Sequence, residues 1–196
     1  MKPPPFQYFA PGELGEALSL LEEHAETGKI LAGGQSLVPL LSLRLAAPGQ
    51  LIDINRVGGL DQIRQEDGGM TIGATARQFG VEHSAEAATA NPLLVEALRH
   101  VAHEPIRRRG TVVGSIAHAD PAAELPAVWL ALDGKATLRS ARGSRTVAAE
   151  GFFSGYFSTA IEANEMLTEV WLRNPAPGQG WAFGEVSRRQ GDFALV

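Results

Sequence analysis

Apolar residues recur at helical spacing in three stretches of the chain. Residues 14–21 place leucine or alanine at i, i+3, i+4 and i+7, a pattern that predicts an amphipathic helix ending before Gly28. A second helix is predicted from Pro92 to residue 101, because proline favours the first helical position and apolar residues share one face of this stretch. The apolar stretch 122–132 predicts a third helix.

Shorter apolar or alternating runs predict β-strands between these helices. The predicted strands cover residues 29–32, 51–55, 70–74, 111–117, 135–141, 165–172 and 183–188. Mixed helices and strands predict either the α/β or the α+β class. We place a soft boundary at Gly58–Gly59, which separates an N-terminal lobe, 1–57, from a larger lobe, 58–196. The apolar run 192–196 predicts either a terminal strand or a shortened chain.

Composition narrows the possible functions. Apolar residues make up 44% of the 196 residues, as in globular proteins, and the net charge of −5 argues against a nucleic-acid groove. The chain has no cysteine, so it cannot itself hold a disulfide or a cysteine-ligated iron–sulfur cluster. It has no apolar run of membrane-spanning length, and the N-terminal segment has no apolar signal core. We therefore predict a cytoplasmic protein without a membrane span.

The first segment with candidate chemistry directly follows a predicted strand. It comprises Ala32, Gly33, Gly34, Gln35, Ser36 and Leu37. Adjacent glycines allow backbone N–H groups to approach a phosphate, and a helix starting near Ser36 would add its dipole. The alternative is an ordinary strand-to-helix turn with Ser36 as N-cap, which spacing alone favours.

The second segment is Gly110 to Ser115, with hydroxyl groups at Thr111 and Ser115 that could reach phosphate oxygens. The alternative is a strand with a bulge at Gly114.

Histidine and arginine residues are weaker candidates for a functional site. His100, His103 and His118 could suggest a metal, but no third ligand at matching spacing and no HExxH pattern is present, so we predict no metal site. Residues 107–109 are three consecutive arginines in an acidic chain, for which phosphate contact, partner contact or simple solvation are all better explanations than nucleic-acid binding. No nucleophile elbow is visible, because Ser36 lacks the G-x-S-x-G frame.

Together these segments carry a family resemblance. Residues 32–57 (AGGQSLVPLLSLRLAAPGQLIDINRV) and 106–128 (IRRRGTVVGSIAHADPAAELPAV) resemble the FAD-binding medium subunit of molybdenum hydroxylases, of the carbon monoxide dehydrogenase type. A weaker match covers residues 164–167 and 183–194. The resemblance extends over essentially the whole chain, but the family continues into a C-terminal domain that this chain lacks. It implies the α+β class, with two α/β subdomains that form a two-lobed FAD-binding domain of the vanillyl-alcohol-oxidase-like type, also called PCMH type.

The resemblance also implies roles for individual residues. Residues 32–37 would wrap the FAD diphosphate through backbone amides, and residues 111–115, including Val113 and Gly114, would hold its other side and the nearby ribityl chain. Glu124 would bond the cofactor, Asp120 would be a further polar neighbour, and Leu167 would offer backbone beside the flavin.

Two positions depart from the family pattern. Arg108 stands where asparagine is common, and Val113 stands where the family has glycine. If the loop keeps the family backbone, Val113 would be strained by roughly 1–3 kcal/mol, and FAD affinity would fall tenfold to a hundredfold. The alternative is that Val113 has ordinary β conformation and points into the core.

The function implied is electron transfer, which needs no side chain as a general acid or base, so we predict no catalytic residue. Partner subunits would carry the molybdenum cofactor (large subunit) and two 2Fe–2S clusters (small subunit), and electrons would pass from the clusters through FAD on this chain to an external acceptor. A self-contained flavin oxidase would need a substrate domain for which the chain is too short. A second alternative is an FAD-free shortened paralogue that acts as an assembly or interaction subunit.

Overall fold

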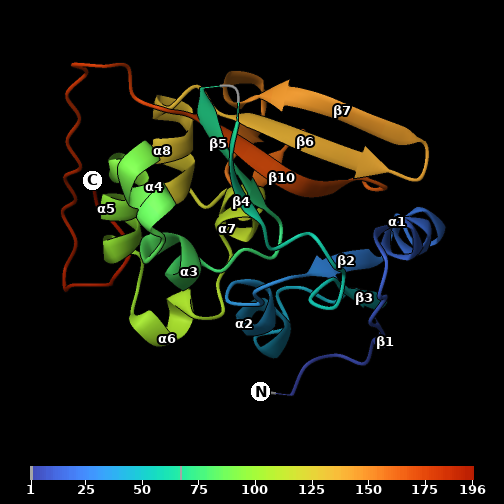
Figure 1. The fold of residues 1–196 in the computed structure, drawn as a ribbon. Coiled ribbons are helices and arrows are strands. Elements are labelled where there is room, and N and C mark those ends of the chain that lie inside the picture. Colours follow the sequence, from blue (N-terminus) through green and yellow to red (C-terminus); the bar gives the residue numbers. More distant parts are fainter. Residues whose placement is uncertain (1, 67) are drawn as a thin grey trace.

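The computed structural model describes residues 2–66 and 68–196. In this part of the chain, helices surround a three-stranded and a five-stranded β-sheet, and two further strands form a hairpin (Figure 1). The smaller sheet comprises β1 (Gln7–Phe9), β2 (Gly28–Leu31) and β3 (Gln50–Asp53). The larger sheet comprises β4 (Ile63–Glu66), β5 (Gly69–Gly73), β6 (Lys135–Ser140), β7 (Gly143–Ala148) and β10 (Met166–Arg173). A hairpin is formed by β8 (Phe153–Gly155) and β9 (Ser158–Thr159).

The helices follow the same order along the chain. They are α1 (Leu14–Glu23), α2 (Leu37–Ser42), α3 (Gln78–Glu82), α4 (Ala85–Ala90), α5 (Pro92–His100), α6 (Glu104–Arg107), α7 (Val112–His118), α8 (Glu124–Ala131) and the short 3₁₀-helix η1 (Ala149–Gly151). The predicted α+β class is confirmed. The three predicted helices are also confirmed: they are α1, α5 and, within residues 122–132, α8.

The smaller sheet is parallel, with strand order β1-β3-β2. Leu51 lies opposite both Tyr8 and Lys29, so β3 is the central strand. Helix α1 makes the crossover between β1 and β2, as parallel strands require. Leu51 and Ile52 are buried in this strand, which explains its apolar sequence.

The larger sheet is antiparallel, with strand order β4-β5-β10-β6-β7. Helix α7 packs against β5 and β10, and α4 packs against β4 and β5. In Figure 1 most of the helices, α3 to α8, gather beside this sheet, while α2 lies with the smaller sheet. The core between these layers includes Ile72, Leu138, Trp129 and Phe152, each buried.

Helix α1 joins the two sheets on the side away from α2, since it packs against β6 as well as against β2 and β3. Its Glu22 accepts hydrogen bonds from Arg142 and, at 2.8 Å, from the Nδ2 of Asn164. The smaller sheet is therefore tied to the larger one by packing and by hydrogen bonds.

Two predicted strands are wrong. Residues 111–117 form α7, because Thr111 caps a helix and because Val112, Val113 and Ile116 are buried together at helical spacing. Residues 183–188 belong to no strand, and neither does the run 192–196; Val186 and the terminal run exchange isolated backbone hydrogen bonds instead. The C-terminal segment instead runs beside α5, where the ring of Phe183 contacts His100 (Figure 1).

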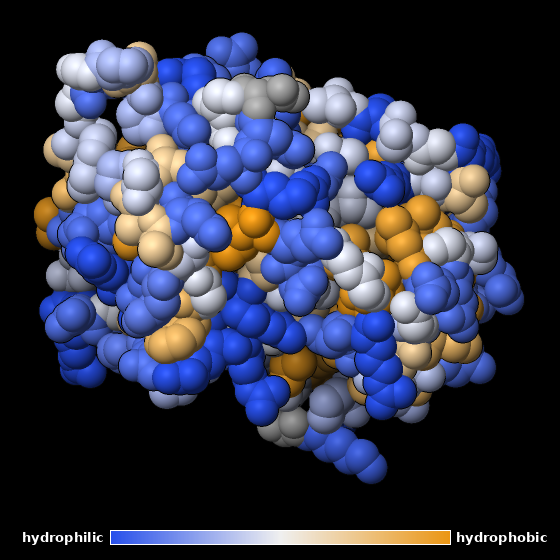
Figure 2. Space-filling view, in the orientation of Figure 1, coloured by the Kyte–Doolittle hydropathy of each residue, from blue (hydrophilic) through white to orange (hydrophobic). Residues whose placement is uncertain are grey.

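The surface on the face drawn in Figure 2 is mostly hydrophilic, with separate hydrophobic patches. In the part of the chain that the structure describes, no helix combines the length and the apolar character needed to cross a bilayer.

Candidate cofactor-binding site

The two glycine-containing segments lie against each other in space. A Cβ atom placed on Gly33 would be 2.5 Å from the carbonyl oxygen of Arg109 and 3.0 Å from the backbone nitrogen of Thr111. Real Cβ atoms do not approach backbone that closely, so only glycine permits this contact. The segments 32–37 and 110–115, separated by more than 70 residues in sequence, thus meet at their first turns.

The first segment leaves consecutive backbone donors unused. Gly34 adopts a left-handed conformation, with φ of +71°. Its carbonyl accepts from the N–H of Val38 at 2.9 Å, and the side chain of Gln35 donates to the carbonyl of Gly33 at 3.0 Å. Within residues 2–66 and 68–196, the N–H groups of residues 34–37 donate to no protein acceptor. Such a row of N–H groups suits an anion.

Ser36 is the N-cap of α2, but its hydroxyl forms no capping bond, and Leu37 is the first helical residue. The turn that spacing alone favoured is therefore present, with a free serine hydroxyl and unused N–H groups added to it. Ala32, at the start of the segment, directs its carbonyl to Asn55.

The second segment begins helix α7. The Thr111 hydroxyl accepts from the N–H of Gly114 at 3.0 Å, and the backbone N–H of Ser115 donates to the Thr111 carbonyl at 3.2 Å. A Cβ on Gly114 would be 2.5 Å from that hydroxyl oxygen, so glycine here makes room for the cap. A bulged strand, the other interpretation of Gly114, is thereby wrong.

Val113 is not strained. It lies inside α7, has no positive φ, and is 2% exposed. The expectation that valine distorts this loop is wrong, because a helical backbone suits any L-residue and the side chain points into the core rather than toward a ligand. The predicted loss of FAD affinity at this position has no basis in the structure.

A second set of residues, which sequence reasoning missed, joins the two segments. The guanidinium of Arg77 donates to the Arg109 carbonyl and to the Oδ1 of Asn55, each at 2.5 Å. The Nδ2 of Asn55 donates to the Ala32 carbonyl at 2.9 Å and to the Oδ1 of Asp53 at 2.6 Å. A lone arginine and a lone asparagine in loops carry no spacing pattern, so nothing in the sequence distinguishes them.

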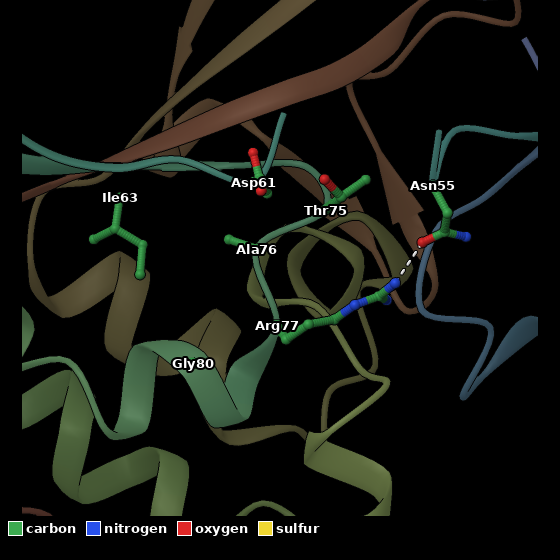
Figure 3. A pocket seen from close by; sticks show the side chains of 7 residues that line it. All are labelled: Asn55, Asp61, Ile63, Thr75, Ala76, Arg77 and Gly80. Carbon is green, nitrogen blue, oxygen red and sulfur yellow. Dashed lines mark hydrogen bonds between the residues drawn. The ribbon is translucent and has the colours of Figure 1, made fainter. Parts of the chain in front are cut away.

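Arg77 also lines a shallow pocket of about 350 Å³, drawn in Figure 3. Its side chain extends across to Asn55, while Thr75 and Asp61 contribute polar groups beside it. The residues that line the pocket are Asn55, Asp61, Ile63, Thr75, Ala76, Arg77 and Gly80.

The three remaining candidate residues lie beyond the C-terminal end of α7 or on elements that α7 contacts. Asp120 follows α7 and accepts from the N–H of Ala122 at 2.9 Å. Glu124 is the first residue of α8, which packs against α7. Leu167 is 5% exposed and lies at a bulge in β10, the strand on which α7 also packs.

Glu124 is half-buried, and burial raises the pKa of its carboxyl. The charges of Glu185 and Asp120 raise this pKa further, whereas its own backbone N–H and His100 lower it. A Glu185 carboxylate oxygen is itself buried without a hydrogen-bond partner. These carboxylates leave acceptors free for hydroxyl groups of a ligand.

The histidines do not converge. His100 contacts Phe183, His118 contacts Phe157, and His103 lies beside Gly191. Among the described residues no group of three His, Asp or Glu side chains is arranged to hold a metal ion.

These features indicate a class of cofactor-binding domain. Two glycine-containing turns lie against each other, and unused backbone N–H groups with a free serine hydroxyl beside them suit an anionic group such as a diphosphate. Residues 4–175 match the family described as the FAD binding domain in molybdopterin dehydrogenase, and the chain belongs to that family.

Individual relatives agree with this assignment. The chain is 45% identical to the 6-hydroxypseudooxynicotine dehydrogenase complex subunit alpha of Paenarthrobacter nicotinovorans, and the match covers 100% of this chain and 66% of the relative. Carbon monoxide dehydrogenase from Hydrogenophaga pseudoflava matches in structure with a TM-score of 0.96 at 42% identity, over 99% of this chain and 68% of that one. Quinoline 2-oxidoreductase from Pseudomonas putida 86 matches with a TM-score of 0.95 at 40% identity, over 100% and 67%. The chain thus spans about two thirds of these relatives.

Proposed function

We propose that this protein binds FAD between residues 32–37 and residues 111–115, and that it serves as the electron-transfer subunit of a molybdenum-containing hydroxylase. The close backbone contact of Gly33 with Arg109 and Thr111 carries the proposal, because two motifs far apart in sequence lie side by side and one diphosphate could contact both. The N–H groups of residues 34–37 would bond the diphosphate, and the hydroxyls of Ser36 and Ser115 would add further donors.

The other contacts follow from the course of α7. Glu124 and Asp120, beyond the helix, would accept hydrogen bonds from ribityl hydroxyls, and the backbone of Leu167 would lie beside the flavin. We retain residues 1–57 and 58–196 as the two lobes of this arrangement. When bound, FAD supplies electron transfer between partner iron–sulfur clusters and an external acceptor.

The partners in this proposal are a large subunit with the molybdenum cofactor and a small subunit with 2Fe–2S clusters. Relatives are named as subunits or medium chains of dehydrogenase complexes, which supports a multi-subunit assembly. The proposal includes a cytoplasmic location, which cell fractionation would test. Co-purification from the native host followed by molybdenum and iron analysis tests the partners.

FAD binding is tested with the purified protein. We expect one FAD per chain in a fluorescence titration, with ADP as a stronger competitor than riboflavin, because riboflavin lacks the diphosphate that the two turns would bind. Absence of flavin binding would contradict the proposal and favour the FAD-free assembly subunit. Val113 no longer favours that alternative, since it is an unstrained core residue.

A further inference from the structure

We propose that Arg77 is a positioning residue for FAD: its guanidinium holds the two cofactor-binding turns at a fixed spacing without touching the cofactor. This inference rests on the proposed FAD site. Arg77 lies at the N-cap of α3, outside both glycine-containing segments, and its backbone pairs with Thr111 in an isolated β-bridge.

The geometry of the guanidinium supports this role. Its two terminal nitrogens donate in different directions, one to the Arg109 carbonyl and one to Asn55, each at 2.5 Å. Figure 3 shows the side chain extended between α3 and Asn55. Asn55 in turn holds the Ala32 carbonyl at 2.9 Å. One planar group is thus connected to the residue that precedes each turn, Ala32 before Gly33 and Arg109 before Gly110.

Asn55, on the small-sheet side of this connection, is itself held in place by hydrogen bonds. The Asp53 carboxylate accepts from both the backbone N–H and the side chain of Asn55, at 2.9 and 2.6 Å, and from the Tyr8 hydroxyl at 2.6 Å. Asn55 therefore has a fixed orientation, with its Oδ1 aimed at Arg77. Tyr8 belongs to β1 and Asp53 to β3, so these hydrogen bonds connect Asn55 to two strands of the smaller sheet.

Electrostatics favour the same role. Arg77 is half-buried and forms no salt bridge among the described residues, and burial lowers the pKa of its guanidinium. Arginine stays charged in proteins despite such shifts. The nearby Asp53 carboxylate raises this pKa electrostatically, but the guanidinium donates to a backbone carbonyl and an amide rather than to a carboxylate. Its positive charge therefore adds a favourable potential beside an anionic diphosphate.

Arg77→Met tests the inference, with FAD affinity as the first readout. We expect at least tenfold weaker FAD binding, equivalent to about 1.4 kcal/mol, because the two turns lose their shared tie. Arg77→Lys keeps the charge but cannot donate in two fixed directions, so it should restore only part of the affinity. In a double-mutant cycle, Asn55→Ala and Arg77→Met should be strongly non-additive, since both break the same connection.

A matched control separates positioning from general destabilisation. Arg145 also donates to one carbonyl, that of Ala160 at 2.7 Å, and to a side-chain carboxylate, that of Glu165, but it lies away from the two turns. Arg145→Met should lower the melting temperature of the FAD-free protein and leave FAD affinity within about twofold, a change below 0.5 kcal/mol.

The spacing of the two sheets gives a readout independent of redox activity. Because the chain has no cysteine, spin labels can be attached at Leu43→Cys in the small-sheet part and Leu130→Cys on α8, both exposed sites. We expect a broader distance distribution in the Arg77→Met protein, narrowed by saturating FAD.

The inference is overturned if wild type binds FAD and Arg77→Met binds it equally well, or if Arg77→Lys fully matches wild type, which would leave charge alone as the cause. It is also overturned if Arg145→Met weakens FAD binding as much as Arg77→Met does. Failure of wild type to bind FAD would instead refute the proposed function.

Discussion

Val113→Gly provides a sharp test of how the second family motif is built here. The family commonly has glycine at this position, so restoring glycine would improve FAD binding if valine distorted the turn. In the structure Val113 is a core residue of α7 that packs beneath the larger sheet with Val112 and Ile116. Restoring glycine should therefore destabilise the protein and leave FAD binding no tighter.

The magnitude follows from burial and backbone entropy. Removing a fully buried valine side chain loses about 1.5–3 kcal/mol of hydrophobic stabilisation. Glycine inside a helix costs a further 0.5–1 kcal/mol or so relative to alanine. The expected loss is about 3 kcal/mol, which corresponds to a melting temperature lower by roughly 6–12 °C in a chain of this size.

Thermal unfolding of the FAD-free protein, with FAD titration alongside, measures both quantities. Val113→Ala is the matched control, because it removes most of the side chain but keeps a good helix former, and it should be more stable than the glycine variant by about 1 kcal/mol. A glycine variant that melts higher than wild type and binds FAD tenfold more tightly would show that Val113 is strained and that this reasoning is wrong.

Two further predictions concern the same site. Gly33→Ala should weaken FAD binding at least tenfold, since the new Cβ would lie 2.5 Å from the Arg109 carbonyl and force the turns apart, whereas Gly15→Ala, which meets nothing within 4 Å, should leave affinity unchanged; equal affinities would refute the contact. Glu124→Gln should stabilise the FAD-free protein at pH 8 but not at pH 4, because a raised pKa means that the stability this group contributes below its ordinary value of 4.5 is lost as pH rises through the folded-state pKa. Denaturant unfolding at the two pH values measures this difference, and a variant less stable than wild type at pH 8 would contradict it.

The local pattern of apolar and polar residues was enough to predict much of the secondary structure. The amphipathic spacing of residues 14–21 and the proline that begins α5 specify helices whose one apolar face is buried. The strand around Leu51 and Ile52 is apolar because it is central in the smaller sheet. These signals reside within a few consecutive residues, so a single sequence reveals them.

The same signal misled at residues 111–117, where consecutive β-branched residues favoured a strand. Helix α7 forms because Thr111 can cap it and because β5 and β10 offer a surface for Val112, Val113 and Ile116. Intrinsic β-preference is worth less than burial of a whole helix face, so tertiary packing decides.

The family of the site was readable from sequence, because its two glycine-containing motifs are specific and lie at the expected separation. The sequence did not reveal why residue 33 must be glycine, since the atoms that exclude a side chain there belong to Arg109 and Thr111, far along the chain. The connection of Arg77 to Asn55 and to the Arg109 carbonyl is likewise a property of the folded chain alone. The sequence determined the family and the two segments that carry its motifs, because motif and spacing are local. The tertiary structure decided what holds those segments together, because hydrogen bonds between distant residues exist only once the chain has folded.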